Sequence, residues 1–222
     1  MYDERNRKIR ENGKVTRERR SHMDCRVISV KIQENRLSKA KLEKLKRCFL
    51  EGKWLYNAIV ATETSSLEDT STVQVKVKDT FETREIKCLS AQMKQSVIEN
   101  VKTNTSNLSK AKRKGLKVGR LQFKKECSEI NLKQFGHTYA IKGKNKIRVQ
   151  NIGILVVNGL EQINLDEVEF ANAKLIQKTS GFYIHLTVYS KKQSQSETEK
   201  EILGLDMGIK DQLTFSNGVK VN

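Results

Sequence analysis

Between residues 118 and 189 the apolar residues alternate with polar ones, a period of two that is typical of β-strands. Glycines at positions 136, 143, 153, 159 and 181 interrupt this region, and they favour turns between short strands. Several short strands at this spacing predict a small barrel over residues 117–190. The expected strands span residues 118–124, 129–134, 137–142, 146–149, 167–178 and 181–189.

A further strand is predicted within residues 25–35, far upstream of the barrel. Its side chains alternate, so that Ile28, Val30 and Ile32 share one face and Val27, Ser29 and Lys31 share the other. An apolar face opposite a polar one indicates a half-buried strand.

The intervening residues 36–116 are predicted to be mostly helical. A first helix starts after the N-cap candidate Ser38 and places Leu42, Leu45 and Phe49 at helical spacing. Gly52 is a possible interruption, after which residues 54–60 resume the helix with Trp54 and Tyr56, which we assign to the core. Alternating Val73, Val75 and Val77 predict a short hairpin, and residues 89–114 form a second helix with Met93, Val97, Val101 and Leu108 as its apolar stripe.

The charge of the chain indicates a polyanionic partner. The 43 Lys and Arg residues exceed the 26 acidic residues and give a formal net charge of +17 over 222 residues. Nucleic acid is the first candidate partner and an anionic membrane surface the second, while a basic surface that serves solubility is the alternative. No apolar stretch approaches the roughly 20 residues that span a bilayer, and the N-terminus has no secretory signal.

Two segments concentrate the basic residues. Residues 1–24 contain eight Lys or Arg residues and almost no apolar ones, so this basic arm is either disordered or ordered by an anion. The second helix ends in Lys110, Lys112, Arg113, Lys114 and Lys117, more than its dipole requires. We expect these residues to contact phosphates. Further candidates for nucleic-acid contacts are Arg120, Lys124, Lys125, Lys133 and Lys210.

The sequence GLDMGIKDQLTFSNG, at residues 204–218, predicts a strand that ends in Asp206, followed by a hairpin through Asn217-Gly218. A carboxylate at a strand end, with glycines beside it, suits a divalent metal and an approaching phosphate backbone. Ordinary turn chemistry explains the same pattern, and a phosphate loop of the sugar-kinase or actin type is a further alternative.

In this order, several stretches of the chain resemble the TnpB family of transposon-encoded RNA-guided nucleases, the ancestors of the miniature type V CRISPR effectors. The similar stretches are RVISVKI, KWLYNAIV, LSAQMKQSVIENVKTN, KRKGLKVGRLQFKKE, GLEQI, ANAKLIQKTSGFYIHLTVY and GLDMGIKDQLTFSNG. The resemblance covers roughly residues 25–222.

The resemblance implies an α+β architecture with an OB-like wedge β-barrel that is interrupted by a helical recognition insertion. Residues 25–35 would supply a wedge strand that pairs within the barrel of residues 117–190, and residues 36–116 would be the insertion, projecting from that barrel. Residues 191–201 would be a linker. Residues 202–222 would begin an RNase H-like RuvC nuclease domain with its first hairpin.

The implied function is metal-dependent DNA cleavage directed by a guide RNA, with target double-stranded DNA as the second partner. Asp206 matches the family's first catalytic Asp and would bind Mg²⁺. The other catalytic carboxylates and a Zn²⁺ ribbon are expected only in sequence beyond Asn222, so we expect residues 1–222 alone to be inactive. The implied location is the cytoplasm of a prokaryote, in association with the nucleoid. Two alternatives remain: an RNA-guided DNA-binding protein without nuclease activity, and a generic basic RNA-binding protein. The sequence does not decide between a monomer and a homodimer.

Overall fold

A computed structural model of the chain describes residues 2–62, 69–192, 204–206, 213–215 and 219–221. It divides into two units, Met1–Lys191 and Lys192–Asn222. The α-helices are α1 (Tyr2–Ser21), α2 (Lys39–Ala61) and α3 (Ala91–Arg113), and the 3₁₀ turns are η1 (Glu34–Arg36) and η2 (Leu160–Gln162). The strands of the first unit are β1 (Met23–Ile32), β2 (Thr72–Val77), β3 (Thr80–Glu85), β4 (Glu129–Leu132), β5 (Tyr139–Ile141), β6 (Lys146–Val149), β7 (Gly153–Asn158), β8 (Val168–Lys178) and β9 (Gly181–Lys191).

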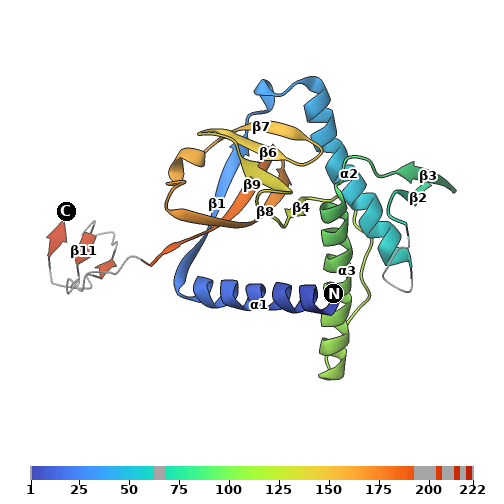
Figure 1. Cartoon of the computed structure of the whole chain (residues 1–222), viewed down its shortest axis with the longest axis horizontal. Coiled ribbons are helices and arrows are strands. Elements are labelled where there is room, and N and C mark those ends of the chain that lie inside the picture. The colour runs from blue at the N-terminus through green and yellow to red at the C-terminus, as the bar shows by residue number, and fades with distance from the viewer. Residues whose placement is uncertain (1, 63–68, 193–203, 207–212, 216–218, 222) are drawn as a thin grey trace. The chain divides into compact units, whose positions relative to one another are not determined.

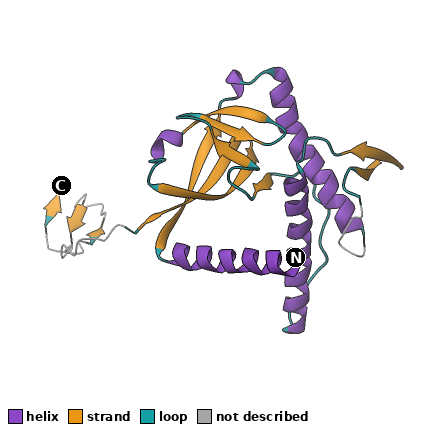
Figure 2. Ribbon diagram, in the orientation of Figure 1, coloured by secondary structure: helices purple, strands orange, loops and turns teal. Residues whose placement is uncertain are grey.

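Seven antiparallel strands form the main sheet in the order β4-β8-β9-β1-β7-β6-β5. The sheet curls into a nearly closed, barrel-like form, with α2 and α3 beside it (Figures 1 and 2). The predicted α+β class is confirmed. Among the described residues, no helix combines the length and apolar character needed to cross a membrane.

Strand β1 lies inside this sheet although its neighbours are far along the chain. It pairs with β9, where Val30 faces Ile184, and with β7, where Ile32 faces Val157. Val30 and Ile32 are buried, while Ser29 and Lys31 on the other face are exposed. The predicted faces of this strand and its pairing within the barrel are therefore confirmed.

One predicted strand of the barrel is wrong, and one strand was missed. Residues 118–124 do not join a β-ladder but form a loop. Strand β7, by contrast, was not predicted, because its glycine-flanked run of Ile154, Leu155, Val156 and Val157 lacks polar alternation. The other predicted strands of the barrel correspond to β4, β5, β6, β8 and β9.

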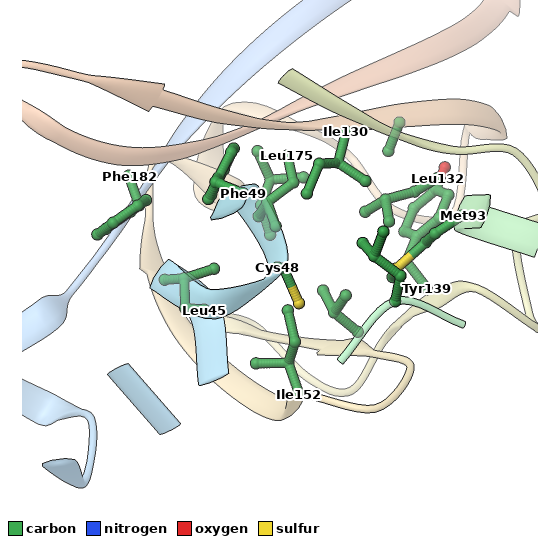
Figure 3. Packing of buried hydrophobic residues seen from close by; sticks show 14 of the residues in the cluster. Leu45, Cys48, Phe49, Met93, Ile130, Leu132, Tyr139, Ile152, Leu175 and Phe182 are labelled. Atoms are coloured by element: carbon green, nitrogen blue, oxygen red, sulfur yellow. The ribbon is translucent and has the colours of Figure 1, made fainter. Parts of the chain in front are cut away.

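Helix α2 and the start of α3 share one hydrophobic core with the barrel (Figure 3). Leu45, Cys48 and Phe49 point from α2 toward barrel residues, and the Phe49 ring stacks on Phe182 at 5.6 Å between centroids. The predicted cap Ser38 is present, and Ser90 caps α3 in the same way, although it was not predicted. Both side chains accept hydrogen bonds from backbone N–H groups three residues on. The insertion thus packs on the barrel through α2 and the start of α3.

Gly52 does not interrupt α2, contrary to the expectation for this residue. A Cβ atom at position 52 would lie 3.1 Å from the Cys127 sulfur, and the glycine allows this close approach. Trp54 and Tyr56 are buried, as predicted.

The carboxylate of Glu51 is fully buried between α2 and the residues that lead into α3. It accepts hydrogen bonds from the backbone N–H groups of Cys88 (2.7 Å) and Leu89 (3.1 Å) and from Nε of Arg47 (3.1 Å). The Arg47 guanidinium in turn lies 4.6 Å from the centre of the Trp54 ring. Burial, with Cys88 and Glu51 close by, raises the pKa of the Cys48 thiol, which therefore remains uncharged beside the carboxylate.

The basic N-terminal segment forms the helix α1, and its ordering by an anion stays a prediction. Its last turn is held to the barrel by Glu169, whose carboxylate binds Arg19 at 2.8 Å and Arg20 at 2.7 Å. Arg20 also lies 4.7 Å from the centre of the Tyr189 ring. Most other side chains described in α1 are exposed.

The second unit contains β10 (Leu205–Asp206), β11 (Leu213–Phe215) and β12 (Lys220–Val221) in one antiparallel sheet of that order. Leu205 pairs with Phe215, and Leu213 pairs with Val221. The predicted strand at Asp206 and the hairpin pairing that follows it are therefore present, while the predicted turn at residues 216–218 lies outside the described residues.

The position of β1 is open to a direct stability test. Val30→Asp should lower the free energy of unfolding by more than about 3 kcal/mol, because it removes a buried apolar side chain and buries an unpaired carboxylate. Ser29→Asp places the same group on the exposed face and should change stability by less than about 0.5 kcal/mol. Urea unfolding measures both variants, and wild-type stability of Val30→Asp would contradict the assigned inner face.

Candidate nucleic-acid interface

The densest positive charge in the sequence lies in residues 110–125, KAKRKGLKVGRLQFKK, which we call the basic segment. It contains eight Lys or Arg residues and no acidic residue. Seven of the eight are exposed and Lys124 is half-buried. The segment begins in the last turn of α3 and continues through the loop that leads to β4.

The end of α3 turns the chain sharply into this loop. Gly115 has a φ of +77°, a left-handed conformation that favours glycine. The N–H of Leu116 donates to the carbonyl of Ala111 at 3.1 Å, and the N–H of Gly115 donates to Lys112 at 3.0 Å. These two bonds form a Schellman motif, which satisfies carbonyls at the helix end and fixes the exit direction of the chain.

Asn57 of α2 anchors the other end of the loop. Its side-chain oxygen accepts from the N–H of Lys124 at 2.8 Å, and its amide nitrogen donates to the Lys124 carbonyl at 3.0 Å. The ammonium group of Lys124 lies 4.4 Å from the centre of the Tyr56 ring, a cation–π contact. The Asn57 side chain thus makes the two hydrogen bonds with the Lys124 backbone that a neighbouring strand would otherwise make. These bonds fix the end of the loop although residues 118–124 pair with no strand.

A groove of about 670 Å³ runs between the C-terminal half of α3 and the loop. Lys112, Lys117 and Arg120 line it together with apolar side chains such as Leu108 and Leu121. The structure therefore brings three of the predicted phosphate-binding residues to one surface. Apolar walls lower the local dielectric and strengthen the attraction of these cations for an anion.

The cations of the basic segment differ in their partners from Lys133 and Lys174. Within the described residues, none of the eight has a carboxylate within ion-pair distance. Lys133, also predicted to bind nucleic acid, instead forms an ion pair with Glu99, and the nearby Lys174 binds Glu129 at 2.9 Å. Lys133 and Lys174 line a separate cavity with His185, so the structure does not group Lys133 with the groove.

Burial lowers the pKa of His185 in that separate cavity, and the charges of Lys178 and Lys174 lower it further. The sequence analysis did not find this cavity. It also missed Asn57, whose partner lies 67 residues further along the chain. No local pattern marks either residue.

The predicted metal-binding residue Asp206 is placed only by its backbone, in β10, and Lys210 lies outside the described residues. Within the parts of the chain that are described, no group of three His, Cys, Asp or Glu side chains is arranged to hold a metal ion. The carboxylate of Asp206 has the chemistry that a hard cation such as Mg²⁺ requires.

Comparison with known proteins adds no family assignment to this geometry. The sequence matches no protein-family model and no curated protein. The basic segment and its two anchors are therefore the basis for assigning a function.

Proposed function

We propose that this chain binds nucleic acid through the basic segment, as the guide-RNA and target-DNA binding part of an RNA-guided DNA endonuclease of the TnpB type. The observation that carries the proposal is the set of eight basic side chains that have no carboxylate partner among the described residues. The Gly115 turn and the Asn57 anchor fix the loop on which Lys117, Arg120 and Lys124 lie. A cation without an acidic partner keeps its full attraction for a phosphate.

The position of the helical insertion in the chain supports a role in RNA-guided DNA binding. A strand that pairs within the barrel, followed by a helical insertion and then the remaining strands, is the order that the resemblance implied for a wedge and a recognition lobe. A guide–target heteroduplex is recognised through its backbone and shape, which requires positive charge and no base-reading residues. The charge of the basic segment is suited to such a role.

A direct test compares two variants with the same loss of charge. Lys112→Gln/Lys117→Gln/Arg120→Gln neutralises the groove, and Lys142→Gln/Lys144→Gln/Lys146→Gln neutralises three exposed lysines around the β5–β6 turn. Affinity for single-stranded RNA and for duplex DNA is measured by fluorescence anisotropy across a salt series. Since each phosphate contact contributes about 0.7–0.9 to the slope of log K against log salt, the groove variant should reduce the slope by roughly 2 to 3.

The control variant should retain most of the wild-type slope. Equal losses in the two variants would mean that net charge alone drives binding, as in a generic basic RNA-binding protein. Wild-type protein that binds neither nucleic acid at low salt would refute the proposal.

The nuclease part of the proposal concerns Asp206, which would contribute one carboxylate to a Mg²⁺ site. The bound metal would activate water and stabilise the leaving oxygen in DNA cleavage. In a chain that carries the remaining carboxylates, Asp206→Ala should abolish Mg²⁺-dependent cleavage and leave RNA binding within about twofold of wild type, because the basic segment is unchanged.

Asp166→Ala removes an exposed carboxylate from the barrel and serves as the matched control, with cleavage expected at the wild-type rate. Normal cleavage by Asp206→Ala, measured on the same guided DNA substrate, would remove the nuclease assignment.

A further inference from the structure

Phe123 is an exposed aromatic ring in the middle of the strongest positive charge. Its exposed fraction is 63%, whereas the rings of Phe49, Tyr139 and Phe182 are buried in the core. Phe135 is also partly exposed, but it stacks on Phe170 at 4.9 Å between ring centroids. Within the described residues, Phe123 has no such aromatic or cationic partner.

The charges near Phe123 are mostly positive, because Glu126 is the one acid within three positions of it. Arg120, Lys124 and Lys125 lie within three positions of it, and the whole basic segment contains no acid. The comparable ring is Phe81 in the β2–β3 hairpin, which is 70% exposed. That hairpin has three basic and three acidic residues: Lys76, Lys78, Arg84, Asp79, Glu82 and Glu85. Among the exposed phenylalanine rings of the described residues, Phe123 is therefore the one that combines an open face with a strong net positive charge.

The backbone around Phe123 is held at its ends and otherwise open. The Gly115 turn and the Asn57–Lys124 hydrogen bonds fix the loop on either side. Between them, residues 117–123 form no backbone–backbone hydrogen bond with the described part of the chain. The ring is thus presented on a defined segment beside the groove that Lys112, Lys117 and Arg120 line.

We propose that Phe123 stacks on a base of single-stranded nucleic acid while Arg120 and Lys125 bind the adjoining phosphates. This inference rests on the proposed nucleic-acid binding of the basic segment and adds a selectivity to it. An aromatic ring can stack on any unpaired base, because every base has an open π-face. A base inside a duplex has both faces covered by its neighbours, so Phe123 favours unpaired nucleotides over duplex.

The test measures the affinities of Phe123→Ala, Phe123→Trp and Phe81→Ala for a 12-nucleotide single strand and for the corresponding duplex. DNA and RNA strands of the same sequence are both used, since stacking does not depend on the sugar. Phe123→Ala should bind the single strands about 5- to 150-fold more weakly, the range expected for loss of one base–aromatic stack. Its affinity for the duplex should change less than about twofold.

Phe123→Trp should retain single-strand affinity, and the emission of its new exposed tryptophan should be quenched by the single strand and not by the duplex. Trp54, the only natural tryptophan, is buried and gives the background signal. Phe81→Ala should bind as wild type.

Equal affinity of Phe123→Ala and wild type for the single strand, or equal losses for single strand and duplex, would overturn the stacking role and leave the proposed binding function intact. Wild-type protein that binds neither would overturn both.

Discussion

The buried carboxylate of Glu51 determines how the two long helices meet, and the position of the basic segment depends on that junction. It accepts from two consecutive backbone N–H groups, those of Cys88 and Leu89, immediately before the Ser90 cap of α3. A buried charge is tolerated only when hydrogen bonds replace the lost water, and here Arg47 and the two N–H groups do so. Removing one partner of such a group typically costs about 3–5 kcal/mol. The start of α3 is therefore tied to α2, and through α2 to the barrel core.

The two ends of α3 differ in burial and in charge. Met93 and Val101 are buried against the core, whereas the basic residues of the last turn are exposed. Cations at a helix C-terminus gain about 0.3–1 kcal/mol each from the helix dipole, an effect that fades beyond the last turn. The basic residues continue past Gly115 to Lys125, where the dipole no longer favours them. Their mutual repulsion is unfavourable in the free protein, and a bound polyanion would relieve it.

The sequence predicts much of the fold because its strongest signals are local. The N-cap Ser38, the alternating faces of β1 and the strands separated by glycines all depend on neighbours within a few residues. The errors arise where distant contacts decide the structure. Asn57 replaces a strand as the partner of Lys124, and Gly52, which lies within α2, leaves room for the close approach of Cys127. The sequence showed that basic residues are dense around Lys112, Lys117 and Arg120, but it did not show that these three line one groove. Nothing in the sequence indicated that Phe123 is exposed.

The central claim is that nucleic acid lies along the loop that follows α3. Ultraviolet cross-linking of the full 222-residue chain to a 4-thiouridine-labelled RNA, followed by peptide mass spectrometry, locates the contact directly. Because the basic segment has eight cations without carboxylate partners in the described structure, cross-links should concentrate in peptides from residues 110–125. Cross-links confined to the equally lysine- and arginine-rich helix α1, or to the surface of β8 and β9, with none in residues 110–125, would contradict the account.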